Sequence, residues 1–277
     1  VEKHTGIAAG DVVVASTGVI GLELSLDPIR GGMDALVQGL GTGSENSSAA
    51  AEAIMTTDTV KKEIAVSFEL DGKVCTMGAI CKGVGMICPN MATMLMFITT
   101  DAAVTPAMLQ KAISSDVKDS LNMLSVDRDT STNDTLCILA SGLAGNRTVE
   151  APGADYKKFC RALHVVTTEL CRMLAADGEG ATRLNECRVR GAKSKKDARL
   201  AAKSVVDSNL VKAMIFGADA NGGRVMCALG YAGAKLDPGR IDVDFRSAAG
   251  ILPAYRQGSA VPCSEDFAKR VLSEKEI

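Results

Sequence analysis

Apolar and polar residues alternate over residues 63–70 (Glu-Ile-Ala-Val-Ser-Phe-Glu-Leu), and this period of two is typical of a strand with one buried face. Asp71-Gly72 follows and is a strong signal for a tight type I′ turn. Residues 73–80 then return with strand character, and residues 136–139 form another short apolar run. The pattern therefore predicts a β-hairpin and a further strand later in the chain.

Two long segments, residues 105–124 and 155–175, carry apolar residues at spacings of three and four, which is typical of helices with one buried face. Further helices are predicted from Asp27-Pro28 onward and over residues 48–55 and 197–214. Because strands and helices are interspersed, the pattern predicts an α/β protein with helices packed on sheets.

The β-branched run Val12-Val13-Val14-Ala15 predicts a buried strand that enters a tight turn at Ser16-Thr17-Gly18. Backbone N–H groups of such a turn can point at a developing oxyanion, although an ordinary connection has the same sequence. Another short strand is expected over residues 187–189. The character of the chain changes near Arg183, so we predict two domains, residues 1–182 and 183–277.

Hydrophobic residues make up 47% of the chain and charged residues 23%, which is ordinary for a soluble globular protein. Aromatic residues make up only 3%, so the core must consist mainly of aliphatic side chains and methionine. The net charge of −2 gives no electrostatic reason to expect binding to nucleic acid or to an anionic membrane. Small-molecule chemistry is therefore the favoured class.

Nine cysteines are spread along the chain without a C-x-x-C pair, and we expect reduced, mostly buried thiols in a cytoplasmic protein. No signal peptide opens the sequence, and no apolar run reaches the roughly 18 residues that a membrane-spanning helix needs. The start at Val1 and the end at Ile277 both look cut, so we expect a fragment of a longer protein.

Thr93 is the candidate nucleophile. A glycine-rich bend and a proline turn precede it, and an apolar run follows, so Thr93 falls where a loop becomes a strand. The only histidines, His4 and His164, are distant in sequence. Cleavage before Thr93 would free an α-amine that can serve as the base for its own hydroxyl. A threonine that merely begins a strand has the same pattern, so spacing alone leaves both interpretations open.

Other polar positions have a structural and a functional interpretation. Gly178 and Gly180 flank Glu179, which presents its carboxylate at a turn, as a plain helix end would also do. The polar segment 125–135 lacks the calcium-loop pattern despite Asp127 and Asp129, so we expect a hydrogen-bonded turn near a pocket. His164 is most simply a histidine on the side of a helix.

Residues 82–101 closely resemble the autocleavage region of the bifunctional ornithine acetyltransferase/N-acetylglutamate synthase family of arginine biosynthesis. Five further stretches resemble the family in the same order and extend the similarity over nearly the whole chain: residues 15–21, 53–59, 129–135, 177–182 and 217–221. Long, ordered matches of this kind are specific.

The resemblance implies a layered helix/sheet/sheet/helix fold of the self-processing, N-terminal-threonine type, with a second, smaller α/β domain. It implies that the precursor cuts itself between Ala92 and Thr93 into an α chain, residues 1–92, and a β chain that begins at Thr93. Thr93 then takes the acetyl group from N2-acetylornithine and passes it to glutamate in a ping-pong cycle without a metal or cofactor. Acetyl-coenzyme A is a further acetyl donor in some members. An α2β2 assembly is also implied.

Site residues carried over from the family are Thr17 and Gly18 for the oxyanion. Substrate contacts are carried over to Lys82, Thr93, Glu179 and the Thr56-Thr57 pair, within which the contacting threonine stays open. A lysine suits a substrate carboxylate, and a glutamate suits a substrate ammonium.

The chain departs from the family pattern at two positions. The family usually has tryptophan where Gly222 stands and glycine where Arg128 stands. It also has residues before Val1 and after Ile277, the latter with further substrate contacts. Two rival hypotheses are a self-processing amidase or aminopeptidase that hands the acyl group to water, and an inactive remnant.

Overall fold

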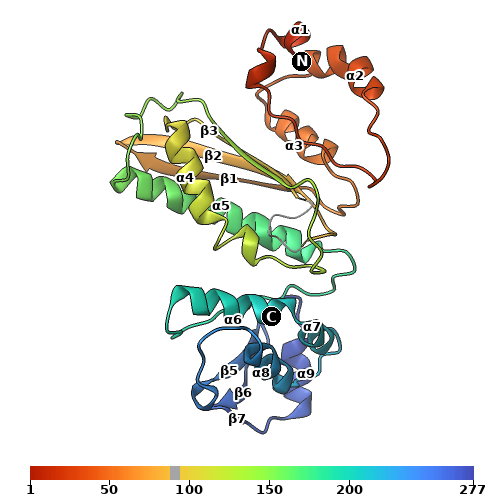
Figure 1. The fold of residues 1–277 in the computed structure, drawn as a ribbon, viewed down its shortest axis with the longest axis vertical. Coiled ribbons are helices and arrows are strands. Elements are labelled where there is room, and N and C mark those ends of the chain that lie inside the picture. The colour runs from red at the N-terminus through yellow and green to blue at the C-terminus, as the bar shows by residue number, and fades with distance from the viewer. Residues whose placement is uncertain (88–93) are drawn as a thin grey trace.

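The predicted β-hairpin forms one side of a four-stranded sheet with the order β1-β2-β3-β4, in which β1 is an edge strand (Figure 1). β1 (Lys62–Leu70) pairs antiparallel with β2 (Lys73–Lys82). The φ angles of Asp71 (50°) and Gly72 (71°) are both positive, as a type I′ turn requires. The computed structural model describes residues 1–87 and 94–277, so the predicted cleavage residues Ala92 and Thr93 lie outside the described residues.

Strand β3 (Leu95–Thr100) pairs antiparallel with β2, and β4 (Thr135–Ala140) pairs parallel with β3. In this register Lys82 lies opposite Leu95, which in turn lies opposite Thr135. The end of β2 and the starts of β3 and β4 therefore meet at one edge of the sheet.

One face of this sheet is buried by a long helix. α5 (Ala154–Ala176) packs on β1 and β2, and α4 (Pro106–Asp116) contacts α5. Phe68 of β1 meets Phe159 of α5 edge-on, with ring centroids 6.1 Å apart. Phe159 is fully buried, and burying such a side chain contributes about 1.5–3 kcal/mol.

The C-terminal part has its own hydrophobic core and a second sheet (Figure 1). The three antiparallel strands are β5 (Val243–Ser247), β6 (Gly250–Arg256) and β7 (Ser259–Ala260). The helices are α6 (Lys195–Asp207), α7 (Asn209–Phe216), α8 (Gly222–Gly230) and α9 (Glu265–Leu272). Helices thus pack on two sheets, and the predicted α/β class is confirmed; the boundary near residue 183 stays a prediction.

The N-terminal segment contains α1 (Glu2–Thr5), α2 (Asp27–Gln38) and α3 (Ser44–Ala53). The first buried residue of the chain is Ala51. The strand predicted for residues 12–15 is wrong: this segment has no strand partner, and Val14 is 81% exposed. The expected turn also lies later, where the N–H of Leu22 donates to the carbonyl of Val19.

Three other boundaries differ from the sequence prediction. Residues 187–189 form no strand; a single parallel bridge joins Leu184 to Glu276 instead. The helix predicted over residues 197–214 is interrupted at Ser208, whose hydroxyl accepts the N–H of Val211 and caps α7. α4 ends at Asp116. Short 3-10 turns occupy Ala9–Asp11, Leu121–Met123 and Pro238–Arg240.

The eight cysteines that the structure describes are all free thiols. Only Cys75 and Cys81 are buried, and Cys227 and Cys263 are exposed, so the expectation of mostly buried thiols is wrong for the described positions. Burial raises the pKa of Cys81 to about 12. Across the described ranges, no helix combines the length and the apolar character needed to cross a bilayer.

Candidate active site

Lys82 is the last residue of β2, and only 3% of it is exposed. It lies opposite Leu95, two positions after Thr93 in the sequence. Burial lowers the pKa of Lys82, while the nearby Asp58 carboxylate raises it. Among the described residues, no carboxylate lies within ion-pair distance of the Lys82 ammonium. The sheet thus holds a buried cation that can accept an anionic partner.

The Thr56-Thr57 turn is tied to the Lys82 loop through Asp58. Asp58 is buried, and its Oδ2 accepts the N–H of Thr56 at 3.3 Å, which stabilises the turn between α3 and β1. Its Oδ1 accepts the N–H of Gly83 at 2.8 Å. Thr56 and Thr57 are exposed. One carboxylate therefore holds the two threonines beside the end of β2.

Glu179 lies against the same loop from the other side. Its N–H donates to the carbonyl of Val84 at 2.8 Å. A Cβ built on Gly85 would lie 2.6 Å from Glu179 Oε2, so a side chain at this position would displace the carboxylate. The structure therefore brings the predicted anion, Glu179, to the loop that follows the predicted cation, Lys82.

An ion triad of Lys62, Asp58 and Asp177 lies next to this loop, with Lys62 and Asp58 buried and Asp177 half-buried. The Lys62 ammonium is 2.7 Å from Asp58 Oδ1 and 2.6 Å from Asp177 Oδ2, and it also donates to the carbonyl of Val60 at 3.2 Å. Lys62 has no exposed surface. Burial raises the pKa of both aspartates, but hydrogen bonds from Lys62 and from backbone N–H groups outweigh it, so both pKa values lie below normal.

Sequence reasoning missed the ion triad, although a signal exists. In the period-two alternation of β1, Lys62 precedes Ile64, Val66 and Phe68 on the face that packs toward α5. A lysine in that series must be paired when buried. The last acidic residue before Lys62 in the sequence is Asp58, four positions earlier.

Thr17 and Gly18 are held near the start of β3 through the segment 133–135. Asn133 Nδ2 donates to the carbonyl of Ser16, the residue before Thr17. The next residue, Asp134, accepts the N–H of Met94 at 2.9 Å, and Met94 follows Thr93 in the sequence. Thr17 is half-buried and Gly18 is exposed. The predicted oxyanion residues and the start of β3 are thus attached to the same segment.

Asp134 is a further residue that the sequence pattern did not indicate. Burial raises its pKa to about 6, although the hydrogen bond from Met94 acts in the opposite direction. Its Oδ2 is buried, and within the described residues no donor reaches it. A carboxyl group with this pKa changes its charge close to neutral pH.

Asp127 binds the backbone just before residue 88. Its carboxylate accepts the N–H of Met86 at 2.5 Å and that of Ile87 at 2.9 Å, and the N–H of Asp129 at 3.0 Å. The N–H of Val126 donates to the carbonyl of Ile87 at 2.6 Å. The predicted hydrogen-bonded turn is confirmed, and segment 125–135 contacts the chain just before and just after residues 88–93.

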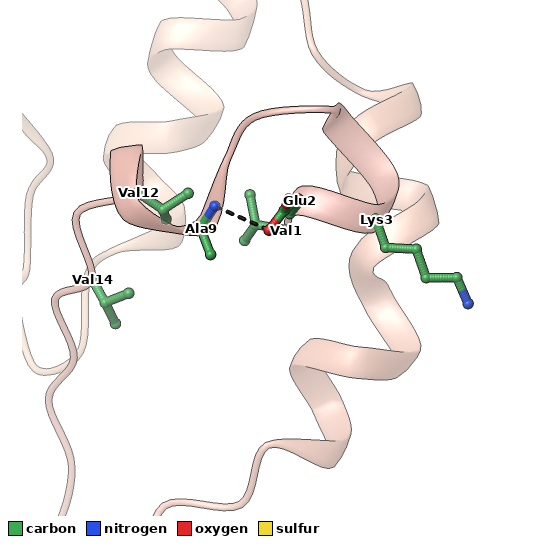
Figure 2. A pocket seen from close by; sticks show the side chains of 6 residues that line it. All are labelled: Val1, Glu2, Lys3, Ala9, Val12 and Val14. Atoms are coloured by element: carbon green, nitrogen blue, oxygen red, sulfur yellow. Dashed lines mark hydrogen bonds between the residues drawn. The ribbon is translucent and has the colours of Figure 1, made fainter.

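A shallow, open hollow lies elsewhere, in the N-terminal segment (Figure 2). Glu2 accepts the N–H of Ala9 at 3.1 Å there, while Lys3 points away. The hollow contains none of the predicted site residues.

His164 is also remote from the site: it pairs with Asp116 at 2.8 Å between α5 and α4, as expected of a histidine on the side of a helix. Over residues 1–87 and 94–277, no group of three His, Cys, Asp or Glu side chains could hold a metal ion.

Comparison with known proteins gives a consistent result. The arginine biosynthesis bifunctional protein ArgJ 1 of Clostridium acetobutylicum is 50% identical over 270 residues, which are 98% of this chain and 66% of that protein. The ArgJ protein of Symbiobacterium thermophilum is 51% identical over 264 residues, 95% of this chain and 64% of that protein. The chain therefore spans somewhat less than two thirds of the length of these relatives.

A solved structure supports the fold. The crystal structure of the arginine biosynthesis bifunctional protein argJ from Bacillus halodurans matches with a TM-score of 0.59 and 38% identity, over 64% of this chain and 81% of the solved chain. The family model described as the ArgJ family matches residues 1–277. The match over the whole chain, together with these identities, shows that the chain belongs to the ArgJ family.

Proposed function

We propose that this chain forms the catalytic part of a glutamate N-acetyltransferase of arginine biosynthesis. It cuts itself between Ala92 and Thr93 and transfers the acetyl group of N2-acetylornithine to glutamate through an acetyl-Thr93 intermediate. The observation that supports this most is that Thr17-Gly18, Lys82 and Glu179 gather around the strand ends that flank residues 88–93. Membership of the ArgJ family supports it independently.

In the first half-reaction, the hydroxyl of Thr93 attacks the acetyl carbonyl of N2-acetylornithine, and the free α-amine of Thr93 takes the hydroxyl proton. The amide C–N bond breaks, and the proton passes to the departing nitrogen, which leaves as the amine of ornithine. In the second half-reaction, the amine of glutamate attacks the ester and releases the threonine hydroxyl. Thr17 and Gly18 stabilise the oxyanion in both steps.

Charge complementarity supports both substrates at one site. The buried Lys82 ammonium offers a cation to the α-carboxylate that both amino acids share. Because Lys82 has no carboxylate partner among the described residues, a substrate anion compensates a charge that the fold leaves buried. Glu179 offers an exposed anion to the side-chain ammonium of ornithine. The threonine pair at residues 56–57, which Asp58 links to the loop after Lys82, supplies a hydroxyl.

The proposed enzyme needs no metal or cofactor. We also propose acetyl-coenzyme A as a second acetyl donor for glutamate; the relatives are named bifunctional proteins of arginine biosynthesis. We further propose an α2β2 assembly of the two cleaved chains and a cytoplasmic location. Size-exclusion chromatography with light scattering tests the assembly.

The direct test uses the complete reading frame that encodes these residues. Intact mass and N-terminal sequencing should find a new chain that begins at Thr93. Incubation with N2-acetylornithine and glutamate should yield N-acetylglutamate and ornithine in equal amounts. Thr93→Ala should abolish both cleavage and turnover, whereas Thr99→Ala, on the exposed side of β3, should leave both unchanged.

Three outcomes would contradict the proposal. A folded wild-type protein that stays in one piece removes the self-cleavage. Release of acetate from N2-acetylornithine in water, without transfer to glutamate, favours an amidase. A folded, cleaved protein without turnover of any kind favours an inactive remnant.

A further inference from the structure

We propose that the ion triad of Lys62, Asp58 and Asp177 is a positioning network that fixes the spacing of the substrate-binding segments, so that the KM of the enzyme depends on it. Its kinetic readout rests on the proposed function, whereas its structural readout does not. Neither lysine nor aspartate of the triad touches substrate in this proposal. Each acts through a neighbouring segment.

The two aspartates of the triad contact several segments of the candidate site, and Lys62 joins the aspartates. Asp58 accepts N–H groups from Gly83, next to Lys82, and from Thr56. Asp177, two residues before Glu179, accepts the N–H of Thr59 at 3.0 Å and also its hydroxyl. The triad therefore connects the threonine turn, the Lys82 loop and the Glu179 loop, which come from distant parts of the sequence.

Stability alone does not explain a buried group of this kind. Removing three charges from water is costly, and well-packed apolar side chains of similar size often give equal or greater stability. Hydrogen bonds to charged groups, by contrast, are short and directional, so they fix positions that apolar packing leaves variable. The triad is thus better suited to holding three loops in register than to strengthening the core.

The triad also acts on the charge of Lys82. Burial lowers the pKa of Lys82, Asp58 raises it and Lys62 lowers it, so the pKa lies below its usual value. Disturbing the triad should move Lys82 and Glu179 relative to each other.

The experiment compares four variants of the full-length enzyme. Lys62→Met removes the link, Asp177→Asn removes one charge but keeps an acceptor for Thr59, and a triple variant (Lys62→Met, Asp58→Asn, Asp177→Asn) removes all three charges. Lys61→Met is the matched control, because the Lys61 ammonium pairs with Glu63 at the surface. Steady-state kinetics give KM and kcat, and hydrogen exchange reports on the N–H groups of Thr59 and Gly83.

We expect Lys62→Met to raise KM for both substrates about tenfold or more, while kcat falls less than about threefold. The N–H groups of Thr59 and Gly83 should lose protection together. Asp177→Asn should show the same pattern more weakly, and it serves if Lys62→Met does not fold. The triple variant should recover thermal stability but keep the raised KM, since a merely structural role would restore both.

The proposal is overturned if the triple variant has wild-type KM and wild-type protection at Thr59 and Gly83. It is also overturned if Asp177→Asn exposes the N–H of Thr59 without any change at Gly83. A wild-type enzyme without transferase activity would contradict the proposed function instead. The exchange measurements would then decide the positioning role alone.

Discussion

The carboxylate of Asp134 accepts the N–H of Met94 at 2.9 Å, one residue after the predicted nucleophile. Burial raises the pKa of this carboxyl group to about 6, from an ordinary value of 3.8. The folded protein therefore holds a proton on Asp134 in a pH range where the unfolded chain has lost it. The stability of the protein therefore depends on pH through Asp134, a residue that holds the start of β3.

Replacing Asp134 by asparagine should remove that dependence. In the wild type, the contribution of Asp134 to the free energy of unfolding is most favourable below about pH 4. It is lost as the pH rises through about 6, where the folded protein gives up this proton. Asp134→Asn keeps an acceptor for Met94 and should stabilise the protein by about 1–2 kcal/mol at pH 7, since the side chain is half-buried. Urea denaturation at pH 4.5 and 7 measures this. Equal pH dependence in the two proteins would refute the assignment, and Asp129→Asn is the control.

Replacing Asp127 by alanine should loosen the chain before residue 88. The N–H groups of Met86 and Ile87 lose their shared carboxylate, and Met86 already has a positive φ of 56°. We expect a loss of about 1–2 kcal/mol, because charged acceptors are worth more than neutral ones but this side chain is exposed. Chemical denaturation checks the value. Asp129→Ala in the same exposed loop should change stability by less than about 0.5 kcal/mol.

Replacing Arg128 by glycine should stabilise the protein. Arg128 has a φ of 74°, a left-handed conformation that costs a residue with a Cβ roughly 1–2 kcal/mol. Part of that gain is offset by the greater freedom of glycine in the unfolded chain, so we expect a net gain of about 0.5–1 kcal/mol. Differential scanning calorimetry measures it. Arg190→Gly is the control: this exposed loop residue has no positive φ, and its replacement should be neutral or destabilising.

Two glycines of α8 should respond to alanine in opposite directions. A Cβ on Gly222 would lie 2.9 Å from Tyr255 Cε2 and 3.1 Å from Ala254 Cβ, so Gly222→Ala should cost about 1–3 kcal/mol. A Cβ on Gly230 meets nothing within 4 Å, and Gly230→Ala should be neutral or gain up to about 1 kcal/mol from helix propensity. Thermal unfolding distinguishes them. A Gly222→Ala protein as stable as wild type would show that Tyr255 does not pack as described.

Replacing Lys82 by methionine should weaken substrate binding. The substrate carboxylate loses a charged partner, which corresponds to a rise in KM of about 10- to 100-fold. Lys73, at the exposed beginning of the same strand, provides the control variant Lys73→Met, which should behave like wild type. If Lys82→Met has an unchanged KM for both substrates, its role as the cation of the site is wrong.

Local signals in the sequence are sufficient to predict elements that pair with the next segment or have one regular apolar face. The β1–β2 hairpin follows from alternation and from Asp71-Gly72, and α5 follows from a periodic apolar face. The strand predicted over residues 12–15 failed because β-branched residues favour extended backbone but do not supply a partner strand. The break at Ser208 is a capping signal that helical periodicity conceals.

Part of the candidate site could be predicted from the sequence. Glu179, Lys82 and Thr17 are recognisable from family resemblance, and the structure gathers them around the same strand ends. The residues that hold them were not, because Asp134 and Asp177 act through contacts with residues 40 and 115 positions away. Contacts across such separations depend on the whole fold and leave no local pattern.

The pairing of β2 with β3 has a consequence for the two pieces that the proposed cut would produce. The antiparallel partners Met77–Lys82 and Leu95–Thr100 lie on opposite sides of the proposed cut, inside one continuous sheet. A cut there would leave the two pieces joined by strand hydrogen bonds and by α5, which packs on β1 and β2. The two pieces would then behave as a nicked protein, held in register by the fold that formed before the cut.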